Sequence, residues 1–190
     1  VSVAVPPVTL TVALWLRVDS YSGSHNYPNL YALRVFWWSD GTNDICLKSQ
    51  IESYSSRNAR FNARVSGGYR YQLSASNFFP VVGRWVHVAA VLDVTAATLY
   101  RNGYSRSWQA SGGAWTPGGG TKMPDSQFGR MEGKTEFHGA MRDLRVYDRA
   151  LDVIEVQALF EAGMPGAGDD DTRPPDWQNP APAGYDYSTD

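Results

Sequence analysis

Apolar and polar residues alternate in several short segments of this chain. From Leu10 to Val18 every second residue is apolar, and a period of two over this length predicts a β-strand with one buried face. Residues 59–65 follow the same pattern, with polar side chains at Arg60, Asn62 and Arg64. A further strand is predicted over 31–37, where the apolar positions are Tyr31, Leu33, Val35 and Trp37.

Turn residues separate these segments. Gly67-Gly68 lies between 59–65 and the alternating segment 69–74, and Asn102-Gly103 follows Leu99–Arg101. Asn-Gly is typical of a type I′ hairpin because both residues tolerate positive φ. Residues 85–92 are apolar at nearly every position, which predicts a strand buried on both faces. At least eight short strands with turns between them predict an all-β fold, a two-sheet antiparallel β-sandwich or jelly roll.

One short helix interrupts this pattern near the end of the domain. Asp152 is a suitable N-cap, and Glu155, three residues later, completes a capping box. Leu151 and Val156 occupy the two positions of a hydrophobic staple, and Gly163 is placed for a left-handed C-cap. We expect an amphipathic helix on the surface of the sandwich.

The composition changes after this helix. Residues 1–163 read as the β-sandwich, whereas 164–190 are rich in Pro, Gly and Asp and read as a linker or tail. The tail still carries Trp177, Tyr185 and Tyr187, which a pure linker seldom needs. We therefore expect these three aromatic residues to contact a partner.

Charge and cysteine content narrow the possible functions. The 190 residues include 17 Lys and Arg against 19 Asp and Glu, a formal net charge of -2, which lacks the basic field expected of a nucleic-acid-binding protein. No apolar run is long enough to span a membrane. Cys46 is the single cysteine, so no internal disulfide forms. Because the chain begins with Val1, it reads as a mature or excised piece of a longer protein.

Exposed aromatic and basic residues are the candidate ligand-binding groups. Trp38, Trp108 and Trp115 lie beside glycine or polar residues, as sugar-stacking residues often do, although packing of loops or a protein interface explains them equally well. The polar face of one hairpin gathers Arg60, Arg64 and Arg70. These arginines are either a solvated surface or a site for an acidic glycan or an acidic segment.

Three stretches resemble the laminin-G-like family of the concanavalin A-like lectin/glucanase superfamily. They are Thr9–Arg17, the pair Gly83–Asp93 and Ala97–Gly103, and the run from Phe128 through Phe137–Leu151 to Glu155–Phe160. The resemblance implies two antiparallel sheets packed face to face. It also implies a module of exported, multidomain proteins that contacts glycans or other proteins, and hence an extracellular or cell-surface location.

Catalysis is not expected. Glucanases of this superfamily resemble one another in a Glu-x-Asp-x-x-Glu strand, and a retaining glycosidase needs two carboxylates about 5 Å apart. This chain has no such strand; its acidic residues come close at Glu132 and Glu136, across a loop, and in the tail run Asp169-Asp170-Asp171. His87 resembles a structural, hydrogen-bonded core histidine. We therefore interpret the protein as a non-enzyme.

No cofactor is expected either, although relatives often hold a structural calcium ion. The resemblance places the ligand of that ion at Arg142, a cation that cannot coordinate another cation. Asp143 is adjacent, but strict alternation would point it to the opposite face of the strand. A hard-metal site needs six to eight oxygens, and the sequence does not supply them.

Two functions remain open. In the first, the chain is an extracellular adhesion or binding module that recognises glycan or a protein. In the second, it is a structural subunit of a surface assembly, in which the aromatic, Pro-rich tail docks on another copy.

Overall fold

The protein is a sandwich of two antiparallel five-stranded sheets in a computed structural model that describes residues 9–20, 34–39, 44–49, 57–65, 68–110, 125–128 and 138–163. One sheet, here the helix-side sheet, has the order β10-β1-β6-β7-β8. Its strands are β1 (Leu10–Val18), β6 (Trp85–Leu92), β7 (Ala96–Arg101), β8 (Tyr104–Ala110) and β10 (Gly139–Tyr147).

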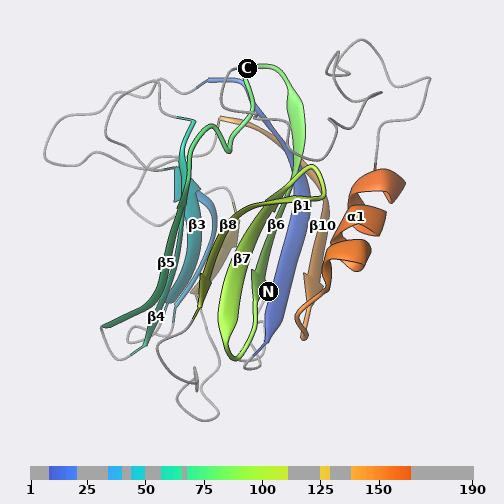
Figure 1. The fold of residues 1–190 in the computed structure, drawn as a ribbon. Coiled ribbons are helices and arrows are strands. Elements are labelled where there is room, and N and C mark those ends of the chain that lie inside the picture. Colours follow the sequence, from blue (N-terminus) through green and yellow to red (C-terminus); the bar gives the residue numbers. More distant parts are fainter. Residues whose placement is uncertain are drawn as a thin grey trace, which may run out of the picture.

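The other sheet, here the second sheet, has the order β5-β4-β3-β2-β9. Its strands are β2 (Arg34–Ser39), β3 (Asp44–Ser49), β4 (Ala59–Val65), β5 (Gly68–Ala75) and β9 (Asp125–Phe128). Helix α1 (Val153–Ala162) packs on the far side of the helix-side sheet (Figure 1). The predicted β-sandwich with one short helix is therefore confirmed.

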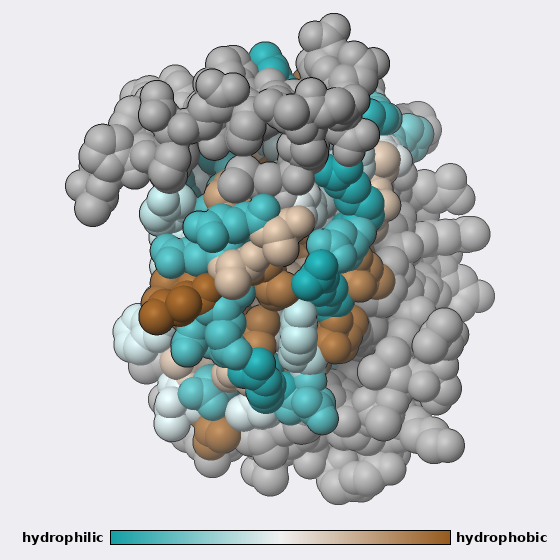
Figure 2. All heavy atoms as spheres, turned by 90° about the vertical axis from the view of Figure 1, so that its right-hand side faces the viewer, coloured by the Kyte–Doolittle hydropathy of each residue, from teal (hydrophilic) through white to brown (hydrophobic). Residues whose placement is uncertain are grey.

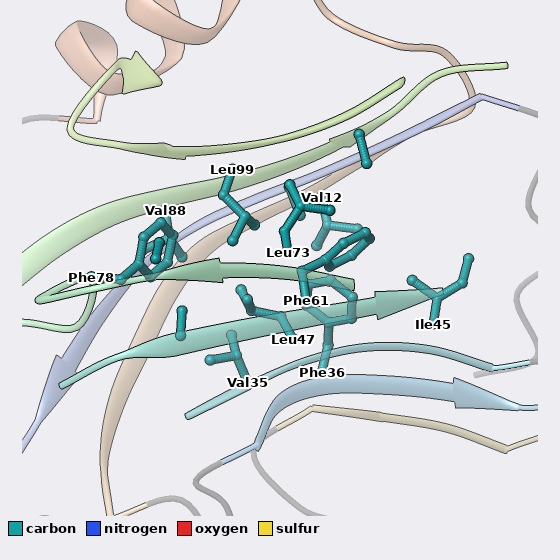
Figure 3. Close-up of a cluster of buried hydrophobic side chains, with 14 of the residues drawn as sticks. Val12, Val35, Phe36, Ile45, Leu47, Phe61, Leu73, Phe78, Val88 and Leu99 are labelled. Atoms are coloured by element: carbon teal, nitrogen blue, oxygen red, sulfur yellow. The ribbon is translucent and has the colours of Figure 1, made fainter. Parts of the chain in front are cut away.

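The main core fills the space between the sheets. Figure 3 shows Phe61 and Leu47 of the second sheet lying between the two layers with Val88, Leu99 and Val12 of the helix-side sheet. Each of these five side chains is at most 2% exposed. Burial of the apolar phase of each strand is the main stabilising contribution to such a sandwich.

Two predicted features of the strands are confirmed. β6 pairs with both β1 and β7 and is buried on both faces. The hairpin between β7 and β8 turns at Asn102 (φ 51°) and Gly103 (φ 80°), as the Asn-Gly pair predicts.

The prediction that β1 has one buried face is wrong. Thr11, Ala13 and Trp15 lie on the second face, and they are also buried. The Thr11 hydroxyl donates to the Arg149 carbonyl and accepts the Leu151 N–H. The segment before α1, together with α1, covers this face, and alternation within one strand cannot reveal such a cover.

The predicted alternation over 31–37 also fails in part. Val35 and Phe36 are both completely buried, because the pairing of β2 with β3 shifts between Arg34 and Phe36. The irregularity shifts the pairing by one residue, so that Trp37 is opposite Cys46. Tyr31 and Leu33 lie outside the described residues.

Helix α1 begins as predicted but ends differently. Asp152 accepts the Glu155 N–H at 2.9 Å and Glu155 accepts the Asp152 N–H at 3.0 Å, which completes the capping box. The expected left-handed C-cap at Gly163 is wrong, because its φ of −90° and ψ of −1° are right-handed. Glycine is required there for another reason: a β-carbon would collide with the indole nitrogen of Trp15.

Candidate functional site

The candidate site is the outer face of the second sheet, the face turned away from the core. Along β4, Ala59, Phe61 and Ala63 are buried in the core, so the alternate positions Arg60 and Asn62 fall on the outer face. The described helix lies on the other side of the molecule (Figure 1). The outer face is formed by the polar phase of β4 and of its neighbouring strands.

Asn62 lies near the centre of this face. It pairs with Cys46 of β3 and with Gln72 of β5. Its side chain is only 4% exposed, and its Oδ1 atom accepts no hydrogen bond from the described residues. The Nε atom of Arg60, two residues earlier, is also buried and donates to no described group. An unpaired buried polar atom costs about 1–3 kcal/mol, so this pair of atoms needs an explanation.

The other two predicted arginines occupy the same hairpin. Arg64 pairs with Asp44 of β3 and with Tyr69 of β5. Arg70 falls between the pairs Ala63–Tyr71 and Arg64–Tyr69, where the register shifts and leaves one extra residue in β5. The structure therefore brings Arg60, Arg64 and Arg70 onto neighbouring strands.

The predicted tryptophans do not join these arginines. Trp108 is 63% exposed, but it pairs with Thr98 on β8 of the helix-side sheet, and Thr98 pairs with Val91 in the cluster beneath α1. Trp38 pairs with Ile45, a core residue. Figure 2 shows that hydrophobic and hydrophilic residues are interspersed on the side where α1 lies. Trp108 is thus on the opposite sheet from the arginines.

Four of the predicted residues lie outside the described part of the chain. They are Trp115, Trp177, Tyr185 and Tyr187. The expected roles of Trp115 in ligand binding and of the tail in docking stay predictions.

A cluster of packed rings around His87 lies beneath α1 on the helix-side sheet. The ring of His87 is centred 5.5 Å from Trp15 and 6.0 Å from Phe160, and Trp15 stacks on Phe160 at 5.6 Å. Burial lowers the pKa of His87 from 6.5 to about 4, with Asp143 opposing and Arg145 reinforcing the shift. Its Nδ1 has no partner among the described residues. His87 is a neutral core histidine held by ring packing.

Arg142 stands where the resemblance implies a calcium ligand. Its guanidinium carbon lies 4.7 Å from the ring centroid of Trp85 and 5.7 Å from that of Trp15, an arrangement of cation–π type. A cation already occupies this position, so the residues present do not fit calcium there. Within the described ranges, no three His, Cys, Asp or Glu side chains gather as metal ligands.

The expected orientation of Asp143 is wrong. Its φ is 49°, and the pairing of β10 with β1 shifts at this point, so the strand contains a bulge. Asp143 therefore binds Arg145 at 2.8 Å and approaches Gly163, on the same side as Trp15. The bulge interrupts the alternation that would have turned Asp143 to the opposite face.

Two residues of the site were missed at the sequence level. Asn62 shares the phase of Arg60 and Arg64, so alternation alone could have identified it. Lys48 lies directly opposite Arg60, but this neighbour depends on the strand order, for which the sequence carries no local signal.

The described part of the chain contains no helix that is long and apolar enough to cross a membrane.

Comparisons with known structures find the same architecture. Domain 4 of an extracellular arabinanase of Geobacillus stearothermophilus, solved with arabinotriose, shares 19% identity at a TM-score of 0.58, over 83% of this chain and 71% of that one. A heptameric SAP-like pentraxin from Limulus polyphemus shares 17% identity at a TM-score of 0.52, over 83% and 72%.

A third similar structure is the binding domain of botulinum neurotoxin DC in complex with rat synaptotagmin II. It shares 12% identity at a TM-score of 0.57, over 81% of this chain but only 35% of that one. Identities this low establish a common fold. No curated protein sequence matches the chain.

Residues 2–157 match the Laminin_G_3 family, described as the Concanavalin A-like lectin/glucanases superfamily. The match covers most of the 190 residues. It agrees with the two-sheet antiparallel architecture and with the structural neighbours. The chain therefore belongs to this family of lectin-like domains.

Proposed function

We propose that this chain is a non-catalytic carbohydrate-binding domain of an extracellular or cell-surface protein. In this proposal, polysaccharide lies on the outer face of the second sheet and contacts Arg60 and Asn62. The fold supports it, since similar structures include an arabinanase domain solved with arabinotriose. A protein partner on the same face is the competing interpretation.

The observation that carries the proposal is the pair of unpaired atoms on β4. The Oδ1 atom of Asn62 is an acceptor and the Nε atom of Arg60 is a donor, and neither has a partner among the described residues. Sugar hydroxyls both donate and accept hydrogen bonds. Both atoms are buried, so a glycan would reach them only by displacing the groups that cover them, and it would then satisfy both.

The spacing of two acidic residues on the outer face argues against retaining hydrolysis. On the outer face, Asp44 pairs with Ser39, which pairs in turn with Asp125 of β9. One strand thus separates the two acids, which places their backbones about 10 Å apart. A retaining glycosidase needs carboxyl groups about 5 Å apart, whereas an inverting one needs about 6.5–9.5 Å, so this spacing argues against the retaining mechanism. Asp44 is in addition opposite Arg64.

Binding to the outer face predicts a specific pattern of variant effects. Replacing Asn62 by leucine removes the buried acceptor, and we expect it to weaken binding to an immobilised polysaccharide panel, which includes arabinan, xylan and polygalacturonate, by at least tenfold. The measurement is biolayer interferometry. Ile154→Ala, on the exposed surface of α1, is the matched control and should bind normally.

Other outcomes of this experiment contradict the proposal. If Trp108→Ala abolishes binding while Asn62→Leu does not, the ligand lies on the helix-side sheet. Failure of the unmodified chain to bind any polysaccharide in the panel rejects carbohydrate binding. Release of new reducing ends from any of them, by protein purified to homogeneity, rejects the non-catalytic assignment.

We also propose that binding needs no metal ion. Because the guanidinium of Arg142 occupies the expected calcium position, addition of EDTA should leave both the polysaccharide affinity and the melting temperature unchanged. Differential scanning calorimetry with EDTA and with added CaCl₂ tests this. A rise of several degrees in calcium would show that a site exists elsewhere in the chain.

A further inference from the structure

Helix α1 is held on the helix-side sheet by a cluster that is separate from the main core (Figure 1). Val156 is the one fully buried residue of the helix, and it belongs to one cluster with Ala13, Ala89, Val91 and Tyr100. The main core between the sheets includes no residue of α1. Because α1 follows the last strand of the sandwich, its detachment would break no pairing between strands. The helix can therefore open as a unit while the sandwich stays folded.

His87 is the ionisable group at the contact between this helix and the sheet. Its ring is centred 5.5 Å from that of Trp15 on β1 and 6.0 Å from that of Phe160 on α1. The turn after β7 contributes the Asn102 amide, which accepts the backbone N–H of His87, and Glu161 of α1 is exposed. His87 is only 2% exposed, and its Nδ1 has no hydrogen-bond partner among the described residues. A proton added to this ring would create a buried charge, which is costly.

The charged groups that face His87 do not offset such a charge. β10 contributes Asp143, which favours the imidazolium, and Arg145, which opposes it, and these two side chains bind each other at 2.8 Å. Arg142, also on β10, places a further cation over the indole of β1. Tyr100 of β7 is neutral in acid, because burial raises its pKa. The surroundings thus favour a neutral imidazole as long as α1 covers it.

We propose that α1 opens from the helix-side sheet as a unit, and that this opening is coupled to protonation of His87. In the open state water reaches the imidazole and solvates its charge. Opening also uncovers the apolar face formed by Ala13, Ala89 and Val91, so α1 acts as an acid-sensitive cover of that face. This device lies on the helix-side sheet and does not depend on whether polysaccharide binds to the other sheet.

The size of the coupling follows from the two states of His87. Burial lowers the pKa of this imidazole to about 4 in the closed state, whereas an exposed imidazole has a pKa near 6.5. Above pH 6.5 both states are neutral, so opening does not depend on pH. Below pH 6.5 the open state binds the proton first, and the equilibrium constant for opening should rise about 70-fold between pH 7.5 and pH 4.5.

Native-state hydrogen–deuterium exchange of the full chain, followed by mass spectrometry, measures this opening. Protection factors, which correct for the pH dependence of intrinsic exchange, are compared for α1 and for β6 at pH 7.5 and pH 4.5. We expect the protection of α1 to be lower than that of β6 at both pH values and to fall about 70-fold on acidification. At low urea concentrations the exchange of α1 should change little, because local opening exposes little surface, whereas β6 should respond steeply, as global unfolding does.

Variants assign the pH dependence to His87. His87→Phe keeps a ring between Trp15 and Phe160 but cannot bind the proton, so the protection of α1 should differ less than about threefold between the two pH values. His138→Gln is the matched control at an exposed histidine and should keep the full difference. If His87→Phe fails to fold, His87→Gln provides the same comparison. Phe160→Ala should lower the protection of α1 at both pH values, because it removes the ring that covers the imidazole.

Any of three results would overturn coupled opening of α1. Equal protection and equal urea dependence of α1 and β6 would mean that the helix opens only when the whole domain unfolds. Unchanged protection of α1 between pH 7.5 and pH 4.5 would mean that no proton is linked to opening. Full pH dependence in a folded variant that lacks His87 would mean that another group binds the proton. None of these results bears on polysaccharide binding, which has its own test.

Discussion

Replacing Trp15 by alanine is expected to lower the free energy of unfolding by about 3–5 kcal/mol. The indole is 3% exposed and stacks on Phe160 of α1 with ring centroids 5.6 Å apart. Its β1 position pairs with His87 on β6 and Arg142 on β10. The substitution therefore leaves a cavity between the sheet and the helix. Urea unfolding followed by circular dichroism provides the measurement.

A conservative variant separates packing from the other interactions of this indole. Trp15→Phe keeps a ring against Phe160, so we expect it to cost less than half as much as Trp15→Ala. Polysaccharide binding should survive in both folded variants, because the candidate site is on the other sheet. A loss of less than 1 kcal/mol in Trp15→Ala would show that α1 is not anchored by this side chain.

The strands could be predicted from the sequence because period-two alternation reports burial directly. Ala59, Phe61 and Ala63 lie in the core as the alternation predicts, and the Asn102-Gly103 turn adopts positive φ. The exceptions arise where a distant segment intervenes. β1 is buried on both faces because α1 covers its second face. Position 163 needs glycine because a β-carbon there would collide with Trp15, not because of its φ.

The candidate site was only partly predictable for a related reason. Arg60, Arg64 and Arg70 lie close together in sequence, so their grouping on one hairpin could be inferred. The alignment of Arg34, Lys48 and Arg60 also requires that β4 pairs with β3 and β3 with β2. Arg34 and Lys48 belong to separate segments, and their alignment depends on register, which includes an irregularity in β2. Local sequence does not encode that alignment.

Acidification is expected to destabilise the protein through His87. Its pKa is lowered by burial to about 4 in the folded state, whereas an unfolded histidine has a pKa near 6.5. Above pH 6.5 both states are neutral and the stability does not depend on this group. As the pH falls from 6.5 to 4 the unfolded state binds the proton first, so the free energy of unfolding falls by about 3 kcal/mol in total and then levels off.

The measurement compares urea unfolding at pH 7.5 and pH 4.5. In His87→Phe, which keeps a ring between Trp15 and Phe160 but cannot be protonated, the difference between the two pH values should shrink by about 2–3 kcal/mol. His138→Gln, at an exposed position, should retain the full difference. Glu155, whose pKa is lowered to about 2 by its hydrogen bond with Arg149, adds a smaller destabilisation near pH 4.5, which is the same in all variants and cancels from the comparison. An unchanged difference in His87→Phe would mean that burial does not keep this imidazole neutral.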